Sequence, residues 1–224
     1  MQISVADILI TLARKRVKYL RLRVVRPGEV VLNVPWHCSV AMAQAFAESQ
    51  AEWLRQHYMP AVTSLPATVR VYGHTLVVVQ EGHARTRRVH RHDDTLVIQH
   101  RPGDDISMRQ RLLHRWYYEQ LHAVLAVLIP QWQATMQTPA VREWRIRSMR
   151  SRWGSCAPRT GVLTFATGLV HYPHEVIAYV VIHELAHLFH PNHAPAFWQC
   201  VASYCPQWRT LRNALRQHET EEGE

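Results

Sequence analysis

The chain has 224 residues, of which 47% are hydrophobic and 19% are charged, and its formal charge is +9. This apolar fraction excludes an intrinsically disordered chain, and the length is sufficient for one domain or two closely packed subdomains with a sizeable core. Because 24 of the 26 cationic residues are Arg, the basic balance is compatible with an anionic partner, although codon bias is the favoured explanation.

Strand patterns dominate the chain up to about residue 105. Polar and apolar residues alternate over 17–24, a turn follows at Pro27–Gly28, and 30–34 is mostly apolar, which together predict a β-hairpin. Two or three further strands are predicted over 69–72, 75–80 and 95–99.

Two predicted helices and a change in composition organise the sequence. One helix is predicted over 39–58 and a longer one over 107–129. Strand patterns give way to helical patterns near residue 105. We therefore predict an N-terminal strand-rich subdomain over 1–105 and a second subdomain over 106–218.

The C-terminal part combines a short strand pair with helices. Alternation over 142–149 predicts a strand that can pair with 163–165. From Pro173 onward the pattern is helical, with a break at Pro191–Asn192. The last six residues, 219–224, hold four of the 17 acids and form an acidic tail, so the rest of the chain is more basic than the total charge indicates.

One short segment concentrates the chemistry. Residues 183–187 read H-E-x-x-H inside a strongly helical run. Side chains four residues apart lie one above the other on a helix, so His183 and His187 can bind the same metal ion. Glu184 lies about 100° around the helix, where it can act as a general base. The alternative, a surface helix with a solvated Glu184, is disfavoured because the preceding turns are apolar nearly all round.

A catalytic zinc ion usually takes three protein ligands, so a third must be found. Residues 188–218 contain no Asp or Glu, which excludes a carboxylate ligand from this stretch. His190 follows His183 by seven residues, a rise of about 10.5 Å on a straight helix, which is too far for both to bind one ion. A chain that turns at Pro191–Asn192 can bring His193 back. The predicted ligands of one zinc ion per chain are His183, His187 and His193.

The segment His183–Trp198, together with R-W-G-S-C at Arg152–Cys156, resembles the YgjP-like metallopeptidase domain family, relatives of the SprT and WLM zinc proteases. Residues 20–24 and 205–208 also fit this family. The resemblance implies an α+β fold, a zincin-like domain with an N-terminal strand-rich subdomain and a C-terminal helical zinc-binding subdomain. Ala194 departs from the Ser expected at that position, which puts a hydroxyl contact in doubt.

From the motif and the resemblance we expect a zinc-dependent metallopeptidase that hydrolyses peptide bonds by a zinc-activated water, with Glu184 as general base. One alternative is a metal-dependent nucleotide pyrophosphatase or phosphohydrolase, an activity also attached to this family and compatible with the Arg excess. Another is a DNA-associated protease of the SprT or WLM kind, although no nucleic-acid-binding motif supports it. The substrate would be a polypeptide or a small anion, and the sequence leaves the oligomeric state open.

Substrate-binding residues are expected in the R-W-G-S-C segment. Arg152 can bind an anionic group, and Trp153 and Ser155 belong to a hairpin that can present its backbone to a substrate. In the structural alternative, Trp153 is a core aromatic residue and Cys156 is a small buried side chain.

The sequence predicts a cytoplasmic protein without a membrane segment. Its first seven residues lack the basic region of a secretory signal, and the longest strongly apolar run, 123–129, is far shorter than the roughly 20 residues of a membrane helix. No two of the four cysteines are spaced as a CxxC pair, and all four are expected to be free thiols.

Overall fold

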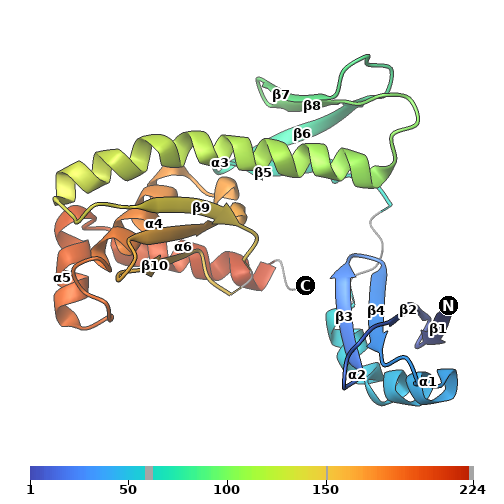
Figure 1. The fold of residues 1–224 in the computed structure, drawn as a ribbon. Coiled ribbons are helices and arrows are strands. Elements are labelled where there is room, and N and C mark those ends of the chain that lie inside the picture. The colour runs from blue at the N-terminus through green and yellow to red at the C-terminus, as the bar shows by residue number, and fades with distance from the viewer. Residues whose placement is uncertain (59–62, 150, 222–224) are drawn as a thin grey trace. The chain divides into compact units, whose positions relative to one another are not determined.

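The structure is a computed structural model that describes residues 1–58, 63–149 and 151–221 (Figure 1). The chain divides into two compact units, Met1–Leu65 and Pro66–Glu224. Both units contain helices and sheets with parallel and antiparallel strand pairs, which confirms the predicted α+β class. Of the predicted acidic tail, 219–221 continue the last helix, and 222–224 lie outside the described residues.

The first unit is a four-stranded sheet covered by two helices. The strands are β1 (Gln2–Val5), β2 (Ile8–Arg14), β3 (Arg21–Arg26) and β4 (Glu29–Val34), in the order β1-β2-β4-β3. The antiparallel β3–β4 pair confirms the predicted hairpin, whereas β1 and β2 have no counterpart in the prediction. The predicted single helix is two helices, α1 (Val40–Ser49) and α2 (Ala51–His57), because the chain departs from helical geometry at Gln50.

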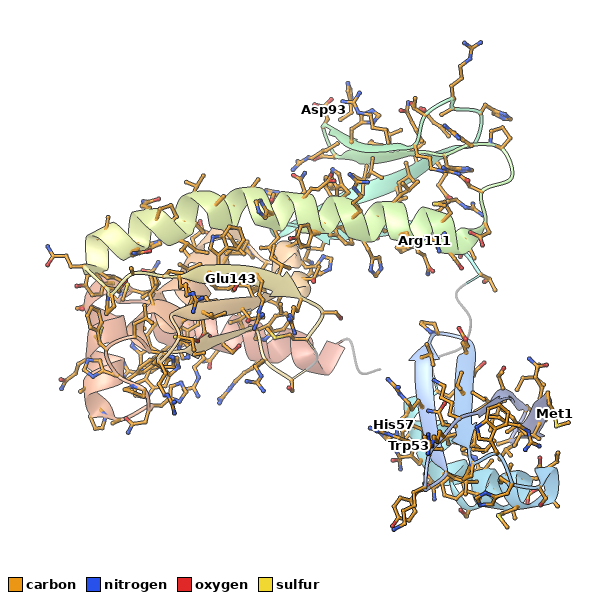
Figure 2. The ribbon with its side chains drawn as sticks, viewed as in Figure 1. Met1, Trp53, His57, Asp93, Arg111 and Glu143 are labelled. Atoms are coloured by element: carbon orange, nitrogen blue, oxygen red, sulfur yellow. The ribbon has the colours of Figure 1, made fainter. Side chains whose placement is uncertain are left out.

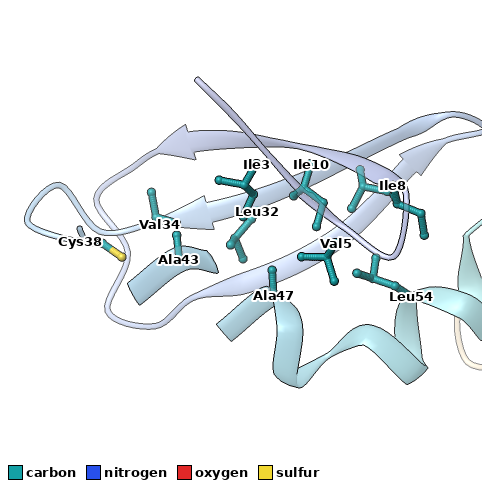
Figure 3. Packing of buried hydrophobic residues seen from close by; sticks show 11 residues of the cluster. Ile3, Val5, Ile8, Ile10, Leu32, Val34, Cys38, Ala43, Ala47 and Leu54 are labelled. Carbon is teal, nitrogen blue, oxygen red and sulfur yellow. The ribbon is translucent and has the colours of Figure 1, made fainter. Parts of the chain in front are cut away.

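The core of the first unit lies between its sheet and these helices. Figure 3 shows the buried side chains, among which Ile10 and Leu32 from the strands and Leu54 from α2 are fully enclosed. On the same helix, the rings of Trp53 and His57 stack with their centroids 4.5 Å apart (Figure 2). A unit of this size with its own buried cluster satisfies the minimum for an independent core.

The second unit begins with a sheet that packs on a long helix. Its strands are β5 (Thr68–Val71), β6 (His74–Glu81), β7 (Arg88–His92) and β8 (Thr95–Gln99), in the order β5-β6-β8-β7, and the helix is α3 (Ile106–Met136). Strands β7 and β8 contact α3. The units therefore divide after Leu65, and not near residue 105. Near residue 105 the chain changes from strands to a helix, but both belong to the second unit.

Helix α3 is longer than the predicted 107–129. Pro130 lacks the N–H that would bond to the preceding turn, and for this reason it favours a helix end at Ile129. The helix nevertheless continues to Met136, which is buried like Ile129. Packing of the apolar face outweighs the loss of one backbone hydrogen bond.

The C-terminal half of the second unit contains a small sheet and three helices. The strands are β9 (Glu143–Arg147), β10 (Gly154–Ala157) and β11 (Val162–Ala166), in the order β10-β11-β9, and the helices are α4 (His174–Ala186), α5 (Pro195–Tyr204) and α6 (Trp208–Glu221). Strand β11 pairs with β9 in parallel, which confirms the predicted pairing. In this half, α4 is central, because β10, α3, α5 and α6 all contact it. None of the described helices is long and apolar enough to cross a membrane.

Candidate active site

Helix α4 carries the H-E-x-x-H motif at its C-terminal end. The helix is buried on nearly all sides, since neighbouring elements cover it from several directions. Glu184 is only 4% exposed. The alternative of a surface helix with a solvated glutamate is therefore wrong. A carboxylate at this depth needs a compensating cation or a functional role.

The helix ends earlier than the sequence indicates. Its last residue is Ala186, His187 is the C-cap, and the following residues form a tightened turn in which Leu188 N–H donates to the carbonyl of Leu185 at 3.0 Å. His190 thus lies directly after this turn and not on the helix, so the predicted reason for excluding it as a ligand is wrong. Its backbone carbonyl instead accepts a hydrogen bond from His187 Nδ1 at 3.1 Å.

Three histidines converge in front of this turn. Among the described residues, the potential ligand atoms of His183, His187 and His193 all lie within 4.8 Å of one another. The Nε2 atoms of His183 and His193 are 3.1 Å apart. Two ligand nitrogens on a tetrahedral zinc ion with bonds of about 2 Å are separated by about 3.3 Å. The three side chains thus have the spacing that a single ion requires after a small adjustment.

The protonation state of these histidines also suits a metal. Burial, followed by the charges of His187 and His193, lowers the pKa of His183 to about 3. Burial likewise lowers the pKa of His187 and of His193. Neutral imidazole is the form that binds a metal ion. Because His187 donates from Nδ1 to a carbonyl, its Nε2 atom carries the free lone pair.

Aromatic side chains from α5 and α6 hold the third histidine. The ring of Trp198 stacks on His193 with centroids 5.5 Å apart, and the ring of Trp208 stacks on Trp198 with centroids 4.3 Å apart. Phe197 is fully buried, and its ring centroid lies within 4.9 Å of those of all three histidines. Although His193 is exposed, its contacts with these rings restrict the orientation of its imidazole.

Glu184 lies beneath strand β10 and beside the histidines. Burial raises its pKa to about 8, and the positive charge of Arg152 opposes this shift. Gly154 covers the carboxyl group so closely that a Cβ atom on it would lie 2.7 Å from the Cγ of Glu184. Only glycine leaves room for the glutamate side chain at this position.

We expect Gly154→Ala to displace Glu184 and to reduce hydrolytic activity about 100-fold, because a misplacement near 1 Å in an active site has an effect of this size. The zinc content should not change, since the three atoms nearest to a Cβ on Gly154 all belong to Glu184 and none to a histidine. Activity assays and metal analysis on the same preparation test this. Gly82→Ala, where the nearest neighbour is the side chain of His100, is the matched control. Full activity of Gly154→Ala would show that Glu184 tolerates displacement.

The residues predicted to bind substrate lie together with the histidines around one cleft of about 790 Å³. Arg152 and Ser155 are in its wall. Trp153 also lines it, but its ring packs at 4.9 Å against Tyr172, which agrees with the structural interpretation. Burial, followed by the charge of Glu184, raises the pKa of Cys156 to about 12, so this residue is an uncharged part of the wall.

Three residues of the cleft have no signal in the sequence. Tyr179 lines it from α4, one turn before the first histidine, and Arg212 and Arg216 line it from α6. Helix α6 lies after the motif and carries no recognisable signature. Its contact with α4 is a tertiary feature that residue spacing does not encode.

The sequence model of a family described as YgjP-like, metallopeptidase domain, matches residues 18–218, which is most of the chain. No curated protein matches significantly. Among solved structures, the chain is similar to the metallopeptidase zymogen of Pyrococcus abyssi abylysin, with 20% sequence identity and a TM-score of 0.40. That similarity covers 42% of this chain and 93% of the other, and its score is too low to establish a shared fold.

Proposed function

The chain belongs to the YgjP-like metallopeptidase domain family, and from this premise we propose that it is a zinc-dependent peptidase whose zinc ligands are His183, His187 and His193. The observation that carries the proposal is the convergence of three imidazoles beside one buried carboxylate, Glu184, in a single cleft. Histidine nitrogens are preferred ligands of zinc, and three of them leave the fourth position open for chemistry.

The roles of the residues follow from their positions. When bound, zinc supplies Lewis acidity and lowers the pKa of a coordinated water toward about 7. Glu184 accepts a proton from the attacking water on its carboxylate and passes it to the leaving amine. Burial raises the pKa of Glu184 to about 8, and the positive charge of a bound zinc ion would favour the carboxylate form that accepts the proton. The His187–His190 hydrogen bond keeps one ligand in a single tautomer.

The position of β10 at the edge of its sheet supports a polypeptide substrate. This strand is at the edge of its sheet and pairs with β11 alone among the described strands, and its residues line the cleft. An extended peptide can add to such an edge through backbone hydrogen bonds. The two alternatives, a nucleotide pyrophosphatase or phosphohydrolase and a DNA-associated protease, would use the same metal site and differ in substrate.

Activity on two substrate classes tests the proposal. Purified protein loaded with zinc is incubated separately with an unfolded polypeptide and with a nucleoside triphosphate, and new amino termini and released pyrophosphate are measured. We expect new amino termini that disappear on chelation and return when zinc is added. Pyrophosphate release without peptide cleavage would assign the site to nucleotide hydrolysis instead. Cleavage that occurs only when DNA is added would favour the DNA-associated protease.

A further inference from the structure

The cleft around the histidines carries an excess of positive charge. Three arginines line it, Arg152 from the segment before β10 and Arg212 and Arg216 from α6. Among the described residues of the lining, Glu184 is the single acidic side chain, and it is buried in the wall. A bound divalent cation adds further positive charge. The electrostatic field in the cleft therefore favours a substrate that brings an anionic group.

Arg212 is held beside the metal site by an aromatic ring. Its guanidinium carbon lies 4.9 Å from the centroid of Trp198, a cation–π distance, and Trp198 in turn stacks on His193. Arg216 follows one helical turn later, so both arginines project from the same face of α6. Stacking orients the plane of the guanidinium and leaves the N–H groups at its edge available to an acceptor.

Within the part of the chain whose side chains are described, these three arginines form no close ion pair, although the charge of Arg152 acts on Glu184 from a greater distance. None of them is in an ion pair of 4.0 Å or less, and their guanidinium groups form no hydrogen bonds there. Arg87 shows the contrasting situation, because it donates two hydrogen bonds to Asp104 at 2.6 and 2.9 Å. The donors in the cleft are thus available for a ligand.

We propose that Arg212 and Arg216 form a specificity site for an acidic side chain of a peptide substrate, close to the bond that is cleaved. This inference rests on the proposed function and specifies its substrate class as acidic peptides. A guanidinium binds a carboxylate, like a phosphate, through two parallel hydrogen bonds. The edge strand β10 favours a polypeptide over a nucleotide as the molecule that carries the charge.

Peptides that differ at a single residue test the preference. A neutral peptide with one cleavage site is made with Glu, Gln or Lys at each position flanking that site. We expect the wild type to cleave the best Glu peptide at a kcat/KM at least about 10-fold above that of the Gln peptide, the size of one charge-assisted hydrogen bond. The Lys peptide should be the poorest. The double variant Arg212→Ala, Arg216→Ala should cleave Glu and Gln peptides equally.

Arg209 provides the matched control on the same helix. Its guanidinium lies 4.7 Å from the ring of Trp208, but it does not line the cleft. Arg209→Ala should keep the preference for Glu, whereas Arg212→Lys should keep part of it because the charge remains. Zinc content is measured for each variant, because the loss of Arg212 removes a contact of the ring that orients His193.

A binding measurement separates failure of this inference from failure of the proposed function. The Glu184→Gln protein, loaded with zinc, is titrated with the Glu and Gln peptides, and tryptophan fluorescence or calorimetry reports binding. Tighter binding of the Glu peptide that is lost in Arg212→Ala, Arg216→Ala supports the specificity site whether or not the wild type cleaves peptides. Equal affinity for the two peptides overturns it. If the protein binds pyrophosphate but not the Glu peptide, the specificity site for an acidic side chain is also overturned, and the arginines bind a phosphate ligand instead.

Discussion

Replacement of Glu184 by Gln is expected to reduce hydrolysis about 10³-fold, within the range found for loss of a general base. Gln has nearly the same shape as Glu and fits beneath Gly154, but its amide cannot accept the proton of the attacking water. The side chain is not a member of the histidine group, so the protein should retain its zinc. Single-turnover rates and zinc stoichiometry measured on the same sample check both parts.

Glu175→Gln is the control for this substitution. Glu175 lies in the first turn of the same helix, is exposed, and does not line the cleft with the histidines. Its replacement should leave both activity and zinc unchanged. If Glu184→Gln retained most of the activity, another group would have to act as base. If it lost zinc, Glu184 would serve the metal site and not the proton transfer.

Replacement of His193 by Ala is expected to abolish stoichiometric zinc binding. Two histidines on one helix remain, and a catalytic zinc site needs a third protein ligand. Because His193 is exposed, its loss should not unfold the metal-free protein. Zinc affinity measured by competition with a chelating indicator should fall at least about 100-fold, and thermal unfolding of the metal-free protein should stay the same.

His190→Ala is a close control, because His190 takes part in the site through its backbone. The carbonyl that accepts the hydrogen bond from His187 is present in the Ala variant as well. We therefore expect normal zinc content and nearly normal activity. Loss of zinc in His190→Ala together with retention in His193→Ala would contradict the assignment of the third ligand.

The prediction of His193 as the third ligand shows how a sequence argument can reach the grouping found in the structure through a wrong step. The elimination assumed that the helix continued to His190, but α4 ends at Ala186. The chain turns sooner, and hydrogen bonds such as Phe189 N–H to the carbonyl of Ala186 hold the turn. The sequence predicts the helix end at Pro191–Asn192, because this break is visible in it. An earlier end without Gly or Pro has no such signal.

The prediction of the fold was likewise correct where the signal is local in the sequence and incomplete where it is not. Hairpin β3–β4 and the β9–β11 pair were predicted because alternation and turn residues are local features. Strand β10 has no predicted bounds, although Trp153 and Ser155 were expected in a hairpin, because Gly154 and Ser155 have low strand propensity. In the structure it pairs with β11 and covers the zinc-binding helix. The unit boundary after Leu65 likewise depends on which elements share a core, which composition does not report.

By itself, the sequence determined that His183, Glu184 and His187 share one helix, because this follows from helical periodicity. The α+β class came from the resemblance to a known family, and His193 came from an elimination that assumed too long a helix. The tertiary structure alone decided that Gly154 lies on Glu184 and that Arg212 and Arg216 reach the cleft. Each of these residues lies on a different element from the motif, Gly154 on β10 and the two arginines on α6. Their approach depends on how β10 and α6 pack against α4, and packing of distant segments leaves no periodic pattern in a sequence.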